Sequence, residues 1–137
     1  MGGRGARYGV SEKGRKYGTE YHTVLQHGNI KFIRFDLSAS ASSPYDTRPG
    51  NGRRIYVTVN QKNEPKYITM YRTDGRRLAQ IDVSGPAHYQ DEKRIETPHI
   101  HIGYEHQGSY VKELNHWERK LLEKIQTIWY SRSDDIT

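Results

Sequence analysis

The segment TPHIHIGYEH, residues 97–106, carries three of the chain's seven histidines: His99, His101 and His106. On a β-strand, residues i and i+2 point to the same face and lie roughly 6.5 Å apart, because each residue advances the strand by about 3.3 Å. His99 and His101 are therefore expected to project side by side, with the isoleucines that alternate with them on the opposite face. Such a pair can bind a metal ion, move protons during catalysis, or sit on a polar strand without chemistry.

Metal binding is the first interpretation. Two neutral imidazoles on one strand can both reach a Zn²⁺ ion at about 2.0–2.1 Å, and an acid or a third histidine completes the ligand set. Asp82, His88 and His106 are the candidates for that role. The chain has no cysteine, so any metal must be held by His, Asp or Glu.

Metal-free cleavage of RNA is the second interpretation. One group would take the proton of the 2′-hydroxyl, a second would protonate the leaving oxygen, and cations would stabilise the charge that develops on phosphorus. The candidate catalytic residues are His99, His101, His88 and Tyr71. The candidate nucleic-acid-binding residues are Arg4, Arg7, Arg53, Arg54, Arg76 and Arg77.

Composition restricts the classes of partner. The 137 residues suit one domain, and an apolar fraction of 33% predicts a small core that depends on its eleven tyrosines. The formal net charge of +6 favours an acidic partner, of which nucleic acid is the commonest. No apolar run reaches the length of a membrane span and no secretion signal opens the chain, so no membrane partner and a cytoplasmic location are expected.

The chain divides into three parts by composition. Residues 1–19 are rich in Gly, Arg and Lys and are expected to form a flexible basic arm. Residues 20–133 are expected to form a single α+β domain, and residues 134–137 a short tail.

Strand patterns fill most of the domain. Residues 21–26 and 29–35 predict a hairpin around His27-Gly28, and residues 53–60, 66–72, 77–83 and 97–102 alternate in the manner of strands. Asp74-Gly75 is the strongest turn signal, because this pair tolerates the positive φ angles of a tight hairpin. Residues 38–52 and 84–96 are expected to be loops.

A helix is expected at residues 114–131. Asn115 and Glu118 have the spacing of a capping box. A single apolar stripe follows and predicts a core-facing side, made of Trp117, Leu121, Leu122, Ile125, Ile128 and Trp129.

These elements predict an α+β fold: a twisted antiparallel sheet of about five strands with the C-terminal helix packed on one face. The face under the helix should hold Ile55, Val57, Val59, Ile68, Met70, Ala79, Ile81, Ile100 and Ile102. The opposite face should receive Tyr56, Thr58, Tyr67, Tyr71, Gln80, Asp82, His99 and His101. Since one helix buries only one face well, that second face is expected to be the working surface.

Four stretches resemble a known family: KYGTEYHTVLQHGNIKFIRF, RRIYVTVNQKNEPKYITMYRTDGRRLAQIDV, PHIHIGYEH and the closing helix through KIQTIWY. Together they are similar to the polymorphic toxin type 50 domain of phage and mobile-element proteins of Gram-positive bacteria, over residues 2–130, with PHIHIGYEH as the most specific part. The resemblance implies a barnase–EndoU–colicin–RelE-like ribonuclease fold, an RNA-cleaving toxin activity and a cognate immunity protein. The family features that the resemblance carries over to this chain are the histidine block of His99, His101 and His106, and His88 in the preceding loop. The chain departs from the family by beginning at its own methionine, and by having Ser84-Gly85-Pro86-Ala87-His88 where members are richer in histidine.

Two functions remain open. The first is a toxin-like ribonuclease that needs no cofactor and acts on RNA. The alternative is a non-enzymatic, zinc-binding phage inhibitor of a host defence nuclease, an anti-CRISPR protein that binds a Cas protein, with the same histidines as ligands of a structural Zn²⁺. The basic charge favours the ribonuclease, whereas two imidazoles and an acid on one face favour zinc.

Overall fold

The computed structural model describes residues 21–36, 54–103 and 110–132. Nine strands and one helix occur in these ranges. Their bounds are β1 Tyr21–His27, β2 Ile30–Phe35, β3 Ile55–Val59, β4 Pro65–Tyr71, β5 Arg77–Asp82, β6 His88–Gln90, β7 Lys93–Ile95, β8 His99–Ile102, β9 Tyr110–Glu113 and α1 His116–Tyr130. The expected arm and tail, residues 1–19 and 134–137, lie outside the described residues, as does the loop at 38–52.

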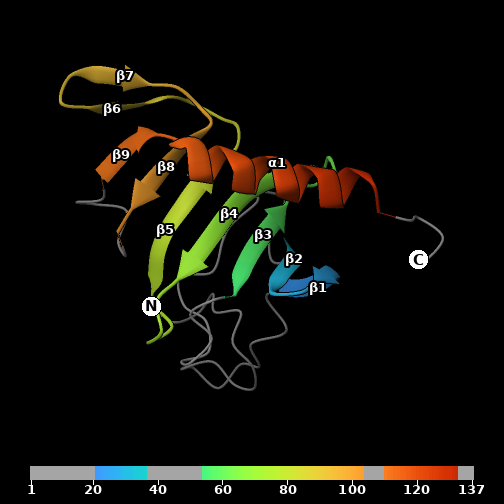
Figure 1. The fold of residues 1–137 in the computed structure, drawn as a ribbon. Coiled ribbons are helices and arrows are strands. Elements are labelled where there is room, and N and C mark those ends of the chain that lie inside the picture. The colour runs from blue at the N-terminus through green and yellow to red at the C-terminus, as the bar shows by residue number, and fades with distance from the viewer. Residues whose placement is uncertain (1–20, 37–53, 104–109, 133–137) are drawn as a thin grey trace.

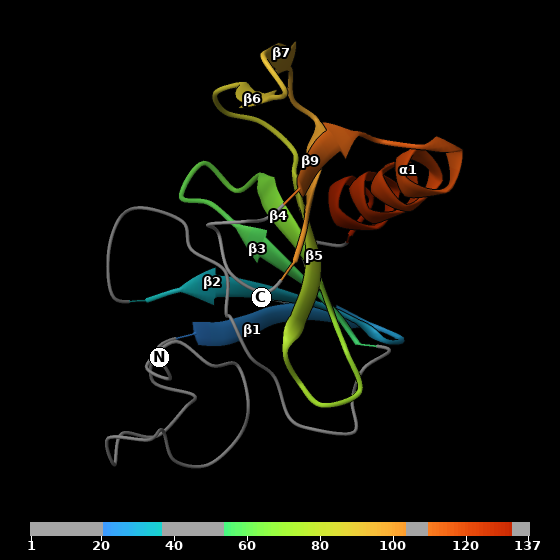
Figure 2. The same ribbon diagram turned by 90° about the vertical axis from the view of Figure 1, so that its left-hand side faces the viewer.

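The expected α+β architecture is confirmed: α1 lies across one face of a twisted sheet (Figure 1), and the edge-on view in Figure 2 shows the two layers. The sheet has seven strands in the order β1-β2-β3-β4-β5-β8-β9, more than the approximately five expected. It is also mixed, because β2 and β3 pair in parallel while the other neighbours are antiparallel.

Two hairpins form where the turn residues predict them. Gly28 has φ 61° between β1 and β2, and Gly75 has φ 91° between β4 and β5. Both values lie in the left-handed region that glycine adopts without steric cost. In the second turn, the Asp74 carboxylate accepts a hydrogen bond from the Arg76 amide at 2.9 Å, which fixes the chain reversal before β5.

The segment 84–96, expected to be a loop, instead contains a small separate hairpin made of β6 and β7. Its three-residue strands are polar and show no alternation of apolar residues, so the pattern did not reveal them. Figures 1 and 2 both show this hairpin beside β9, at the opposite end of the sheet from β1.

The core between the sheet and α1 is formed as expected. Phe32 stacks on Trp129 with ring centroids 5.2 Å apart, and the Trp129 indole donates a hydrogen bond to the Asn63 carbonyl at 2.8 Å. The buried cluster contains Ile30, Phe32, Val57, Val59, Ile68, Ala79, Ile81, Ile100, Leu114, Leu121, Leu122, Ile125 and Trp129, with Ile55, Met70, Ile102 and Ile128 packed at its margin.

The N-terminus of α1 has the predicted capping box. The Asn115 side chain accepts from the Glu118 amide at 2.8 Å, and the Glu118 carboxylate accepts from the Asn115 amide at 2.9 Å. Glu118 is also the buried residue of this first turn, so its neighbour Trp117 points away from the sheet and is 62% exposed. The assignment of Trp117 to the core stripe is therefore wrong.

The second face of the sheet is also largely buried, which corrects the expectation that only one face would be. Tyr21, Ile33, Tyr56 and Tyr71 form a second buried cluster on which Phe35 packs. Thr58, Thr69, Gln80, His99 and His101 are buried as well. His99 and His101 are thus enclosed side chains rather than parts of an open polar surface.

Candidate metal centre

Four side chains with metal-binding atoms converge at the β5–β8 end of the sheet. Asp82 is the last residue of β5, directly opposite His99 in the register with β8, and His101 follows two residues later on the same face. His88 comes from β6, in the separate hairpin. One ligand atom from each of the four residues lies within 4.8 Å of all the others.

Two distances between the candidate ligand atoms match those of a tetrahedral zinc site. Two ligand atoms of such a site lie about 3.3 Å apart, because each is about 2.0–2.1 Å from the ion and the bonds diverge at tetrahedral angles. The Oδ2 atom of Asp82 is 3.4 Å from Nε2 of His99 and 3.1 Å from Nε2 of His101. An ion between Oδ2 of Asp82 and the Nε2 atom of either histidine therefore requires little movement of those side chains.

The three imidazole rings are arranged around a common point. His88 lies nearly perpendicular to His99, at 85°, and to His101, at 89°, with centroid distances of 5.2 Å and 4.7 Å. The rings of His99 and His101 are 4.9 Å apart at 78°. Rings that meet edge to face can direct a nitrogen of each ring toward the shared space, which parallel stacking would prevent.

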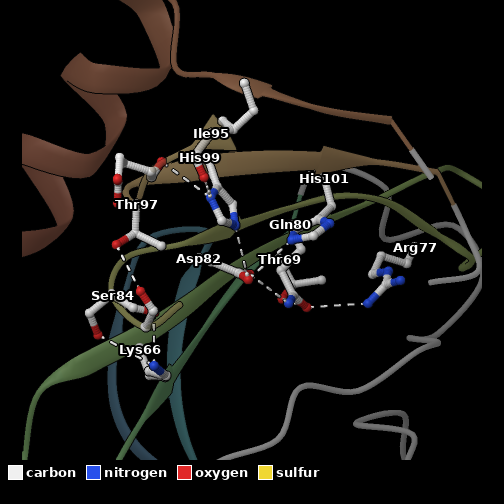
Figure 3. Close-up of polar contacts among 12 residues, drawn as sticks. Lys66, Thr69, Arg77, Gln80, Asp82, Ser84, Ile95, Thr97, His99 and His101 are labelled. Atoms are coloured by element: carbon white, nitrogen blue, oxygen red, sulfur yellow. Dashed lines mark hydrogen bonds and ion pairs between the residues drawn. The ribbon is translucent and has the colours of Figure 1, made fainter. Parts of the chain in front are cut away.

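The surroundings of His99 decide which of its nitrogens carries the proton (Figure 3). Its Nδ1 lies 3.3 Å from the Ile95 carbonyl oxygen and 3.2 Å from that of Glu96. A carbonyl oxygen only accepts hydrogen bonds, so Nδ1 is assigned as the protonated donor. In the neutral ring Nε2 then presents a lone pair toward the Asp82 carboxylate. It makes no hydrogen bond with the described residues.

Two facing lone pairs repel each other unless a cation lies between them, and either a proton or a metal ion can supply that charge. Metal-binding histidines commonly donate their other N–H group to a backbone carbonyl, which fixes the tautomer and the orientation of the ring. His99 has this arrangement, on a side chain that is fully buried. The observation favours a metal ligand over an ordinary core histidine.

Asp82 is held in its ionised form. Burial alone would raise its pKa, but hydrogen bonds from His101 and Gln80 outweigh that effect, together with the positive charges that His101 and His99 carry when their rings are protonated, and the pKa lies below its usual value. Gln80 donates from Nε2 to Oδ1 of Asp82 at 3.0 Å, leaving Oδ2 directed at the two histidines. An ionised, oriented carboxylate is the form that binds a cation.

A row of polar contacts supports this carboxylate from behind (Figure 3). The Oε1 atom of Gln80 accepts from the Thr69 hydroxyl at 3.4 Å and from the Arg77 guanidinium at 3.3 Å. Thr69 and Arg77 are both buried. Sequence analysis placed Gln80 on this face but did not identify its supporting role, which its i−2 spacing from Asp82 could have indicated.

The other predicted site residues are dispersed. Tyr71 pairs with Arg77 in the β4–β5 register, at the far end of these strands from the Tyr67–Asp82 pair, and its ring packs on Tyr56 at 5.4 Å. Tyr67 is the tyrosine next to Asp82; burial and then the Asp82 charge raise its pKa. The structure thus does not bring Tyr71 together with the histidines.

The predicted arginines also occupy different environments. Arg54 is half-buried before β3, Arg76 is exposed in the β4–β5 turn, and Arg77 is buried. Arg4, Arg7, Arg53 and His106 lie outside the described residues.

Comparisons of the chain with models of known families, with curated proteins and with solved structures found no match. The expected relation to the polymorphic toxin type 50 domain therefore stays a prediction from the sequence stretches quoted above. No helix within residues 21–36, 54–103 and 110–132 is long and apolar enough to cross a membrane.

Proposed function

We propose that this chain is a zinc-binding protein in which Asp82, His88, His99 and His101 hold one Zn²⁺ ion. The arrangement of His99 carries the proposal: Nδ1 faces two backbone carbonyls while Nε2 faces a carboxylate oxygen at 3.4 Å. Three imidazoles and one carboxylate suit Zn²⁺ better than Ca²⁺ or Mg²⁺, which prefer all-oxygen ligand sets.

The ion is proposed to be structural rather than catalytic. Catalytic zinc sites commonly have three protein ligands and keep one position open for water or substrate, whereas four protein ligands close a tetrahedral site. Here four ligands are available, and His99 and His101 are 0% and 5% exposed. The ion would connect β5, β8 and the β6–β7 hairpin.

If the ion only stabilises the fold, the biological activity must come from residues on the protein surface. We propose that the chain is the non-enzymatic alternative considered above: a mobile-element inhibitor of a host defence nuclease of the Cas class, acting in the bacterial cytoplasm. The sequence stretches that resemble a mobile-element toxin domain, and the burial of His99 and His101, support this proposal. It predicts a stable complex with a Cas protein, without RNA cleavage.

Metal content and thermal stability test the zinc proposal. Purified protein should contain about one Zn²⁺ per chain, and chelation should lower Tm by roughly 5 °C or more, since a ligand present at 100 times Kd stabilises by about 2.7 kcal/mol. His99→Ala should lose the ion, whereas His27→Ala, at an exposed position, should retain it. Protein that contains no zinc and is indifferent to chelators would exclude the proposal.

A metal-free ribonuclease remains the second candidate. Its support is the close approach of titratable groups, with His101 3.1 Å from Asp82 and the ring of His88 beside both histidines, in a chain of net charge +6. A buried histidine can reach a phosphate only if the segments that cover it move. This candidate predicts RNA cleavage in the presence of EDTA that leaves 2′,3′-cyclic phosphate ends, and toxicity on expression.

A further inference from the structure

The four candidate ligands come from two separate β-sheets. Asp82, His99 and His101 belong to neighbouring strands of the seven-stranded sheet, whose hydrogen bonds hold them together without any ion. His88 belongs to the two-stranded β6–β7 sheet. An ion bound by all four therefore cross-links the small hairpin to the large sheet.

The hairpin has little packing of its own. An isolated two-stranded hairpin is marginally stable at best in water. Tyr89 is 66% exposed, and Lys93 and Arg94 are exposed as well, while Ile95 is the buried apolar residue of its strands. Its position against the sheet consequently depends on a few discrete contacts.

One of these contacts covers the edge of the large sheet. Among the described residues β9 is the edge strand of the sheet, and the Gln90 side chain accepts a hydrogen bond from the Val111 amide at 3.0 Å. Beside this contact lies a cavity of about 460 Å³ between the hairpin and β9, lined by Gln90, Asp91, Lys93, Ile95 and residues 110–113. The hairpin thus touches β9 at Gln90, and because of the gap it does not pack along the whole length of this strand.

We infer that the metal centre is a latch: the ion fixes His88 to the main sheet and thereby holds the β6–β7 hairpin over the edge of β9. This inference rests on the proposed zinc site. When the ion leaves, the main sheet and α1 keep their own core, whereas the hairpin loses its attachment at His88 and swings away. Gln90 then no longer covers Val111, and the exposed edge of β9 can pair with another extended strand.

Hydrogen–deuterium exchange on the full chain tests the latch. After removal of zinc, amides of residues 87–96 and of Val111 should exchange at least about 10-fold faster, and by a larger factor than amides in β3, β4 and β5, which should remain protected. His88→Ala should show the same pattern with zinc present. Gln90→Ala should raise exchange at Val111 alone and leave the zinc content unchanged.

The outcomes separate the two proposals. If the protein binds no zinc, the proposed function fails and the latch fails with it. If it binds one zinc but removal leaves exchange in the hairpin unchanged, the latch is wrong and the metal site stands. If removal deprotects the hairpin and the central strands equally, the ion supports the whole fold and the latch is again wrong.

Discussion

The Nε2 atom of His99 and the Oδ2 atom of Asp82 face each other at 3.4 Å, from adjacent strands and in direct register. The other ring nitrogen of His99 is engaged by backbone carbonyls, so the ring cannot donate a hydrogen bond to this carboxylate while it remains neutral. Either a proton on Nε2 or a divalent ion between the two atoms would resolve this conflict, and the proposed Zn²⁺ is the second of these.

Replacing the carboxylate ligand should weaken zinc binding strongly. Asp82→Asn keeps the size of the side chain but removes its charge. Mutating a residue that only hydrogen-bonds to a metal ligand typically lowers metal affinity by about 10–100-fold. Because Asp82 is itself a ligand, we expect zinc affinity to fall by more than about 100-fold. Competition with a chromophoric chelator measures the affinity. Asp36→Asn, which alters the exposed partner of His22, is the matched control and should bind as the parent does.

Replacing Gln80, which orients the Asp82 carboxylate, should lower zinc affinity less than replacing Asp82 does. Gln80→Ala removes the donor that orients Oδ1 of Asp82, and zinc affinity should fall by about 10-fold in protein that circular dichroism shows to be folded. Stability should also fall, by about 1–3 kcal/mol, because buried Thr69 and Arg77 lose an acceptor. Gln61→Ala changes an exposed glutamine and should leave both quantities unaltered. Unchanged affinity in Gln80→Ala would show that this contact does not support the site.

The helix–sheet core should respond independently of the metal. Ile125 is fully buried against the sheet, so Ile125→Ala should cost about 2–5 kcal/mol in the free energy of unfolding while zinc affinity is retained. Trp117→Ala removes a larger side chain that is 62% exposed, and should change stability by less than about 0.5 kcal/mol. Chemical denaturation of the zinc-loaded proteins gives both values. A larger loss of stability in Trp117→Ala than in Ile125→Ala would contradict the orientation of α1.

The helix cap should contribute a measurable share of stability. Asn115→Ala removes the acceptor for the Glu118 amide and should cost about 0.5–2 kcal/mol. Glu118→Gln keeps an acceptor for the Asn115 amide and loses the charge that faces Lys112 at 3.0 Å, so its cost should be smaller, below about 1 kcal/mol. Equal costs in urea denaturation would show that the ion pair contributes as much as the cap at this end of the helix.

Local signals in the sequence predicted much of the fold. Period-2 alternation located the strands at residues 55–59, 65–71 and 77–82. Asp74-Gly75 located the turn that joins the second and third of these strands, and the Asn115 cap located the helix. The parallel β2–β3 pair could not be predicted, because it joins strands through a long connection whose path no local pattern determines. Strands β6 and β7 have three residues each, too few for a period to be recognised, and β9 has one buried residue, Val111, which shows no period.

In the candidate site, too, local sequence patterns predicted some features, while others depend on tertiary contacts. The i, i+2 spacing placed His99 and His101 together, and their shared face with Asp82 followed from the alternation of β5. The position of His88 depends on how the β6–β7 hairpin packs on the sheet, which is a tertiary contact. The carbonyls that orient His99 belong to Ile95 and Glu96, where the chain leaves β7, and side-chain patterns carry no information about such backbone groups.

X-ray absorption spectroscopy at the zinc K-edge, on protein purified without added chelator, tests the central claim most directly. The account predicts about one zinc per chain with four nitrogen or oxygen ligands at about 2.0–2.1 Å, and multiple scattering that requires three imidazoles. His88→Ala should reduce the imidazole count to two, whereas His27→Ala should leave the spectrum unchanged. A six-coordinate oxygen environment, or protein that retains no zinc at all, would contradict the account.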